Sequence, residues 1–167
     1  MVKAALTAEA AWEVLEGVLD PEVPALSVVD LGIVRDVRVT ESAAEVDVTP
    51  TYSGCPAMRV IEEEIAGALR AAGAADVAVR IVYQPAWTTD WISDAARERL
   101  RAYGIAPPGP VPRDDELVPL RRRAETVPCP FCGSSRTERK SEFGSTACKS
   151  LHVCLSCRQP FEHFKAI

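Results

Sequence analysis

Apolar residues follow two spacings along the first hundred residues, and each spacing predicts a different kind of element. Ala11, Leu15 and Val18 recur at the spacing of one helix face, and Thr7 precedes them as a helix-capping residue. The spacing therefore predicts a helix over residues 8–19. The run Asp-Pro-Glu-Val-Pro follows and ends this helix, because proline removes a backbone donor and restricts the residue before it.

Three further segments have the shorter apolar spacing of β-strands. They cover residues 33–39, 45–49 and 76–83, and a polar loop over residues 40–44 joins the first two as a hairpin. One face of the third strand is apolar throughout and consists of Val77, Val79, Ile81 and Tyr83. A residue on this face would be at least half-buried in a small sheet.

Helical spacing returns twice and completes the first part of the chain. It predicts a helix that follows Cys55-Pro56, runs to about residue 72 and is ended by Gly73, and a last helix that Thr89 caps and Gly104 ends. The order helix–strand–strand–helix–strand–helix predicts an α+β domain over residues 1–105, with helices on one face of a small sheet. The buried faces of these two helices are predicted to contain Ile61, Ile65, Ala68, Leu69 and Ala72, and then Ile92, Ala96, Leu100 and Tyr103.

The tail, residues 127–167, has two Cys-x-x-Cys pairs, Cys129–Cys132 and Cys154–Cys157, separated by twenty-one residues. Two short turns that each offer two sulfurs form a tetrahedral four-thiolate metal site, as in a zinc ribbon. The tail has few apolar residues, and segments this short usually need a metal, disulfides or a partner to fold. Zinc is the first expectation, while iron, as one ion or as a cluster, fits the same ligands.

Other residues of the tail leave alternatives open. Two disulfides would be the interpretation in a secreted module, but the N-terminus does not resemble a secretory signal and no stretch reaches the length of a membrane span. A cytoplasmic protein with reduced thiols is expected. His152 could replace one sulfur, and Cys148 could be an exchanging ligand, a reactive thiol or a packed core residue.

Charge and proline content separate the two parts. Residues 1–106 contain nine Lys/Arg and seventeen Asp/Glu, and residues 107–167 contain ten and seven. The acidic first part argues against a nucleic-acid partner, because neutralising phosphates requires basic patches. Residues 106–126 are rich in proline and are predicted to form a linker. The run Arg121–Arg123 is either an anion or partner site or solvated chain.

The loop over residues 51–56, Thr-Tyr-Ser-Gly-Cys-Pro, has the features of a reactive site. Cys55 precedes a proline that suits the first helical position, so its thiol lies at a helix start where free N–H groups favour a thiolate. The alternatives of a reactive or metal-binding thiol and a buried inert one remain equally open. Asp20 and Glu22 could join Cys55 in binding iron or in proton transfer, although spacing favours a role in capping turns.

Three motifs of the first part resemble the SufT-like domain of iron–sulfur assembly factors. They are residues 20–24 (DPEVP), 29–34 (VDLGIV) and 51–56 (TYSGCP), and the resemblance covers about residues 8–105. It implies an assembly role in which Cys55, with Asp20 and Glu22 nearby, transiently holds iron or a cluster.

Motifs of the second half of the chain sharpen this resemblance. Residues 87–92 (WTTDWI), 103–108 (YGIAPP), 141–149 (SEFGSTACK) and 160–165 (PFEHFK) resemble the D-subunit family (PaaD, also called PaaJ) of bacterial phenylacetyl-CoA epoxidase systems. The resemblance implies aerobic phenylacetate catabolism and, as partners, a di-iron catalytic subunit or a reductase with flavin and a [2Fe–2S] cluster. It implies a maturation subunit that is not itself catalytic.

The residues agree with an accessory role. The sequence offers no Glu-x-x-His pair, no dinucleotide fingerprint and no hydroxyl–histidine triad. An electron carrier with iron in the tail is the alternative, and a catalytic Cys55 is disfavoured because the first part has no histidine to act as its base. A homodimer is a further expectation, since a small sheet has free edges.

Overall fold

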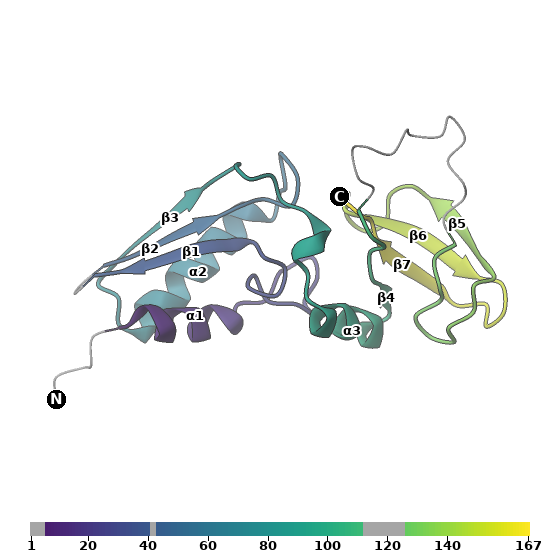
Figure 1. Cartoon of the computed structure of the whole chain (residues 1–167), viewed down its shortest axis with the longest axis horizontal. Helices are drawn as coiled ribbons and strands as arrows, with labels where there is room; N and C mark the ends of the chain where they lie inside the picture. Colours follow the sequence, from purple (N-terminus) through teal and green to yellow (C-terminus); the bar gives the residue numbers. More distant parts are fainter. Residues whose placement is uncertain (1–5, 41–42, 112–125) are drawn as a thin grey trace. The chain divides into compact units, whose positions relative to one another are not determined.

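The computed structural model describes residues 6–40, 43–111 and 126–167 of the chain, which divide into two compact units (Figure 1). The first unit comprises the chain up to Trp87 together with Trp91–Ser93, and the second comprises Thr88–Asp90 together with Asp94–Ile167. Each unit has its own sheet, and helices and strands are mixed along the chain. The α+β class is therefore confirmed.

Five elements build the first unit in the predicted order. They are α1 (Ala8–Glu16), β1 (Val34–Val39), β2 (Ala43–Val48), α2 (Met58–Ala72) and β3 (Asp76–Ile81). The strands form one sheet in the order β1-β2-β3, in which β1 and β2 are an antiparallel hairpin and β3 runs parallel to β2 across the α2 crossover. The hairpin loop was predicted at 40–44, but β2 begins at Ala43, and residues 41–42 lie outside the described part of the chain.

Local signals set the helix ends of this unit. Thr7 caps α1, its Oγ1 accepting the N–H of Ala10 at 3.2 Å, and Gly73 ends α2 in the left-handed region at φ 119°. The helix α1 stops at Glu16, earlier than the apolar pattern predicts, because Gly17 already turns back to bond the carbonyls of the last turn. Both helices cover one face of the sheet (Figure 1). The fully buried side chains of this core include Leu15, Leu26, Ile61, Ile65, Leu69 and Val46.

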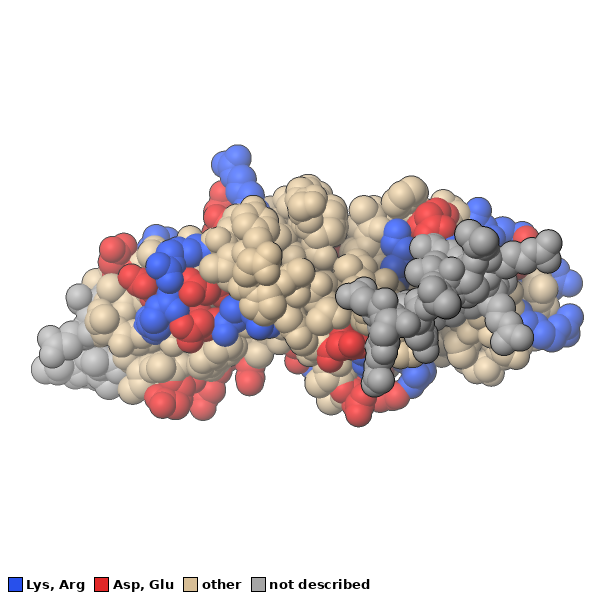
Figure 2. All heavy atoms as spheres, turned by 45° about the horizontal axis from the view of Figure 1, so that its top comes forward, with Lys and Arg blue, Asp and Glu red and all other residues tan. Residues whose placement is uncertain are grey.

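The other face of this sheet carries a network of charged residues. Asp47 on β2 accepts hydrogen bonds from Arg38 of β1 at 3.0 Å and from Arg80 of β3 at 2.9 Å. These side chains hold the pKa of the Asp47 carboxyl at about 2. Figure 2 shows acidic and basic side chains intermixed over part of the molecular surface. The network ties all three strands together across their solvent face.

The second unit contains α3 (Asp94–Tyr103), β4 (Ile105–Ala106), β5 (Thr137–Ser141), β6 (Lys149–Cys154) and β7 (Pro160–Phe164). The strands form a second sheet in the order β4-β7-β6-β5. This division differs from the predicted domain end at residue 105, because β4 pairs with β7 and both of its residues are buried in the second unit. Most of the predicted linker, including Arg121–Arg123, lies outside the described residues.

Two helix starts were predicted too early. Thr89 begins a short 3-10 helix (Thr89–Trp91) and does not cap α3, because its Oγ1 accepts the N–H of Ile167 at 3.2 Å. Cys55 lies before α2, whose N-cap is Ala57 and whose first residue is Met58. The strand β3 likewise ends at Ile81, which leaves Tyr83 outside the sheet and exposed.

Candidate metal centre and the Cys55 loop

The four cysteines of the tail come from two turns with the same geometry. In each turn the residue after the second cysteine has a left-handed backbone, Gly133 at φ 71° and Arg158 at φ 65°. Its N–H donates to the carbonyl of the first cysteine, Cys129 at 2.9 Å and Cys154 at 3.0 Å. Each turn thereby directs two sulfurs to the same side.

The sulfurs meet at one point. All four Sγ atoms lie within 4.8 Å of one another, with Cys129 and Cys157 at 3.7 Å and Cys132 and Cys154 at 3.6 Å. Ligands about 2.3 Å from a central zinc ion at tetrahedral angles would be about 3.8 Å apart. The residues present therefore fit a single four-coordinate ion. Hydrogen bonds from the backbone N–H groups of Cys157 and then Ser156 outweigh burial and lower the pKa of Cys154 to about 6, which favours a thiolate at this one cysteine. At Cys157 a backbone N–H is instead outweighed by burial and the neighbouring sulfurs, which raise the pKa of that thiol to about 12.

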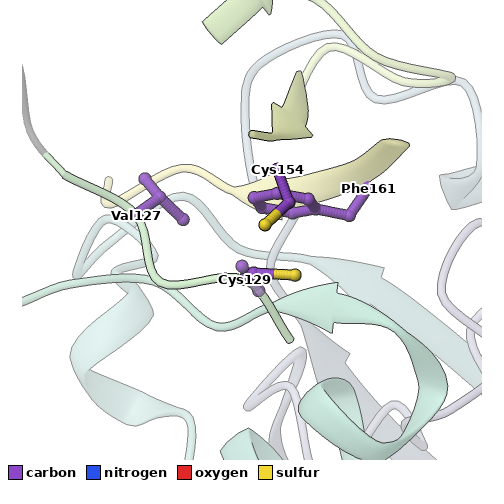
Figure 3. Packing of buried hydrophobic residues seen from close by; sticks show 5 residues of the cluster. Val127, Cys129, Cys154 and Phe161 are labelled. Atoms are coloured by element: carbon purple, nitrogen blue, oxygen red, sulfur yellow. The ribbon is translucent and has the colours of Figure 1, made fainter. Parts of the chain in front are cut away.

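A small apolar cluster supports this site. Val127, Cys129, Cys154 and Phe161 are all at least 95% buried and pack together with Ala106 of β4 (Figure 3). Cys132 is the exposed member of the four and Cys157 is half-buried, so solvent reaches one side of the site. The metal ligands are thus also a large part of the core at this end of the second unit.

Cys148 and the two histidines do not join the four converging sulfurs. Cys148 is buried, with its Sγ 3.1 Å from the hydroxyl of Thr146. The Nε2 atom of His152 lies 3.0 Å from Ser150 Oγ, and its ring stacks on Phe161 with centroids 5.5 Å apart. Among the described residues only Cys129, Cys132, Cys154 and Cys157 converge, so the alternative of a histidine ligand is not supported.

The Cys55 loop connects β2 to α2 in the first unit. Gly54 has φ 93°, a left-handed value that lets the chain turn, and the N–H of Cys55 donates to the carbonyl of Tyr52 at 3.2 Å. The Cys55 side chain is half-buried. The backbone N–H of Ala57 and the side chain of Thr51 both interact with its thiol. The motif over residues 51–56 includes Thr51, but no role was predicted for its hydroxyl, since no local spacing distinguishes it from that of any other loop residue.

The charges of Asp20 and Glu22 act on the Cys55 thiol. Asp20 is buried, and its Oδ1 accepts the N–H groups of Glu22 and Val23, each at 2.8 Å, so it also shapes the turn after α1. Burial raises the pKa of the Cys55 thiol, the Ala57 N–H opposes this, and the charges of Glu22 and Asp20 raise it further. The expectation of a pKa lowered by the helix end is therefore wrong, because burial and two carboxylates outweigh the N–H groups.

Two protein families match consecutive parts of the chain. Residues 8–81 match the family described as "Iron-sulfur cluster assembly protein", and residues 113–165 match the "PaaD zinc beta ribbon domain". The chain thus combines an iron–sulfur assembly domain with a zinc ribbon that contains the four-cysteine cluster. No helix among the described residues is long and apolar enough to cross a membrane.

Individual relatives agree with these matches. The chain is 46% identical to the "Putative 1,2-phenylacetyl-CoA epoxidase" D subunit of Escherichia coli (strain K12), over 93% of this chain and 91% of that protein. It is 38% identical to the "Fe-S protein maturation auxiliary factor YitW" of Bacillus subtilis (strain 168), over 50% of this chain and 82% of that protein. A crystal structure of a DUF59 domain from Bacillus anthracis superposes with a TM-score of 0.52 at 29% identity, covering 56% of this chain and 90% of that one. The chain belongs to the PaaD family, the D subunits of phenylacetyl-CoA epoxidase.

Proposed function

We propose that the chain is a maturation subunit that helps to assemble an iron centre of the phenylacetyl-CoA epoxidase system. Its assembly domain resembles proteins named as Fe-S maturation factors, and its full-length relative is named as a subunit of that epoxidase. The proposed client is either the di-iron catalytic subunit or the iron–sulfur reductase of the system. The chain itself supplies no catalyst to the epoxidation.

The observation that carries this proposal is that the charges of Glu22 and Asp20 act on the half-buried Cys55 thiol of the assembly domain. The Cys55 thiol and two carboxylates whose charges reach it would offer iron, which is the cargo here, fewer protein ligands than a closed site, and binding iron would displace the thiol proton. An ion held by so few protein ligands keeps open positions that a client's ligands can occupy. The half-exposed Cys55 offers the access that such a transfer needs.

The zinc ribbon has a different role in this proposal. Its four thiolates close the coordination of one ion, so Cys129, Cys132, Cys154 and Cys157 would hold zinc permanently and stabilise the module. A cluster would place its own iron and sulfide atoms between the thiolates and spread them further apart. The separations of 3.6 Å and 3.7 Å therefore favour a single ion over a cluster, and the metal analysis below separates zinc from a single iron ion.

Metal analysis and a substitution test the two roles separately. Protein purified without oxygen is expected to contain about one zinc per chain, as a closed four-thiolate site predicts, and no visible absorption. Cells that carry only Cys55→Ser are expected to make the epoxidase subunits but to leave them inactive and short of iron. Cys148→Ser is the matched control, because it removes a thiol outside both sites and should leave the client active. Full client activity with Cys55→Ser would refute the assembly role, and visible bands from iron with sulfide would favour an electron carrier.

A further inference from the structure

The strand β3 forms an incompletely covered edge of the first sheet. Among the described strands it pairs only with β2. Val77 at its start is 9% exposed and packs under the helices, but Val79 is only half-buried and Ile81 is 39% exposed. An edge with exposed apolar side chains and unpaired backbone groups is a ready template for another strand.

The backbone of β3 presents its free groups in a defined register. The N–H of Val82 donates to the carbonyl of Val48 on β2 at 2.8 Å. Successive residues of a strand direct their N–H and C=O groups to opposite sides, so the even-numbered residues of β3 face β2. The N–H and C=O groups of Val77 and Val79 therefore point to the open edge, where the N–H of Val77 donates to Asp76 Oδ1 at 2.9 Å, a local bond that pairing with another strand would replace.

We propose that β3 pairs with β3 of a second copy of this chain, antiparallel, about a two-fold axis at Ala78. In this register Val77 lies opposite Val79 of the other copy, and these are the residues whose backbone groups point outward. Asp76 lies opposite Arg80 of the other copy, at the closely spaced positions where opposite charges attract most. The apolar and charged side chains of β3 thus match those of β3 in the second copy. A two-fold interface requires this match, because both copies contribute the same surface.

The charged partners are accessible for this pairing. The Arg80 side chain is 57% exposed although its Nε and Nη2 atoms donate to Asp47, and Asp76 is exposed at the start of the strand. The resulting six-stranded sheet would place Ile81 against Ala75 of the other copy and remove more apolar surface from water.

The opposite edge of the sheet lacks these properties. The pairing of β1 with β2 is irregular between Val34 and Asp36, and such bulges protect an edge from further pairing. Val34 and Val37 are already 5% and 6% exposed, so a second copy would gain little burial there. Arg35 lies 3.7 Å over the ring of Trp91 and further occupies this edge. We therefore assign the pairing to β3.

Light scattering on the full, metal-loaded chain tests the proposal over a dilution series. Wild type is expected to have twice the chain mass of 18.1 kDa. Asp76→Arg places the new arginine opposite Arg80 of the second copy, and Arg80→Glu places the new glutamate opposite Asp76. The dimer dissociation constant of each variant alone should therefore rise roughly tenfold or more. A mixture of the two variants faces only opposite charges and should regain the doubled mass, which also shows that both variants are folded.

Hydrogen exchange on the wild type gives a second readout that needs no substitution. The amides of Val77 and Val79 should exchange more slowly at high protein concentration than at low concentration, while the amides of β1 should not change. A wild-type monomer throughout the dilution series, single variants that dimerise like wild type, or a mixture that stays monomeric would each overturn the pairing of β3 with itself.

Discussion

Substituting Cys129 is expected to unfold the cysteine end of the second unit while the first unit stays folded. Cys129 is 2% exposed and belongs both to the four-thiolate cluster and to the apolar cluster beneath it. Cys129→Ser replaces a soft thiolate with a hydroxyl, a poor zinc ligand that is now buried. The metal-to-protein ratio should therefore fall far below that of the wild type.

The structure indicates how large this loss is. Among the described residues, Val127 and Phe161 are the members of the apolar cluster other than cysteine and alanine, and burying them contributes roughly 3–6 kcal/mol together. Structural zinc contributes about 10–16 kcal/mol of folding free energy in small zinc modules. The ion therefore contributes more than the apolar cluster, and the cluster alone should not hold the two cysteine turns together.

Amide NMR spectra with and without a strong chelator measure this directly. Signals of residues 127–137 and 154–161 should lose their dispersion, in chelated wild type and in Cys129→Ser alike. Signals of the first unit should stay in place, because it has its own core. Cys148→Ser is the control that keeps all four ligands and should keep its metal. Dispersed signals from the cysteine turns after complete metal removal would refute the reasoning.

Three further predictions concern other sites. Glu22→Gln removes a charge that raises the pKa of Cys55, so iodoacetamide should alkylate Cys55 faster at neutral pH; an unchanged rate would contradict this. Gly32→Ala should lower the free energy of unfolding by roughly 1–3 kcal/mol, because φ is +68° and the new Cβ would lie 3.1 Å from a tryptophan carbon. Gly67→Ala, which has open space in a helix, is its control and should not destabilise in the same denaturant titration. Burial lowers the pKa of His163 from 6.5 to about 4. Between these two pH values the histidine is protonated in the unfolded state but not in the folded state. Stability should therefore fall by about 3 kcal/mol as the pH drops from 6.5 to 4, and the loss should shrink in His163→Gln; equal losses in both would count against it.

Features that depend on nearby residues could be predicted from the sequence. The Thr7 cap, the Gly73 helix end and the two Cys-x-x-Cys turns all involve residues a few positions apart, and the structure contains each of them. The strand β4 was not predicted, because two residues are too few to show the alternating apolar pattern of a strand. Its partner β7 also lies more than fifty residues later in the sequence.

The properties of the candidate sites depended more on distant contacts. The pKa of Cys55 was misjudged because burial, and carboxylates from a segment more than thirty residues earlier, decide it. The ion pair of Lys149 with Glu162, at 2.9 Å with the lysine almost fully buried, could not be anticipated either. The spacing of charged residues along the sequence does not indicate which of them form ion pairs between neighbouring strands.

The pairing of β4 with β7 changes what the proline-rich segment connects. Residues before it, in β4, and Val127 after it belong to the same unit, so both ends of the segment are anchored in one fold. The changes of unit along the chain therefore lie at residues 87–94, before β4, and not in the proline-rich segment. An insertion or deletion after β4 would thus leave the covalent connection between the Cys55 domain and the zinc ribbon unchanged.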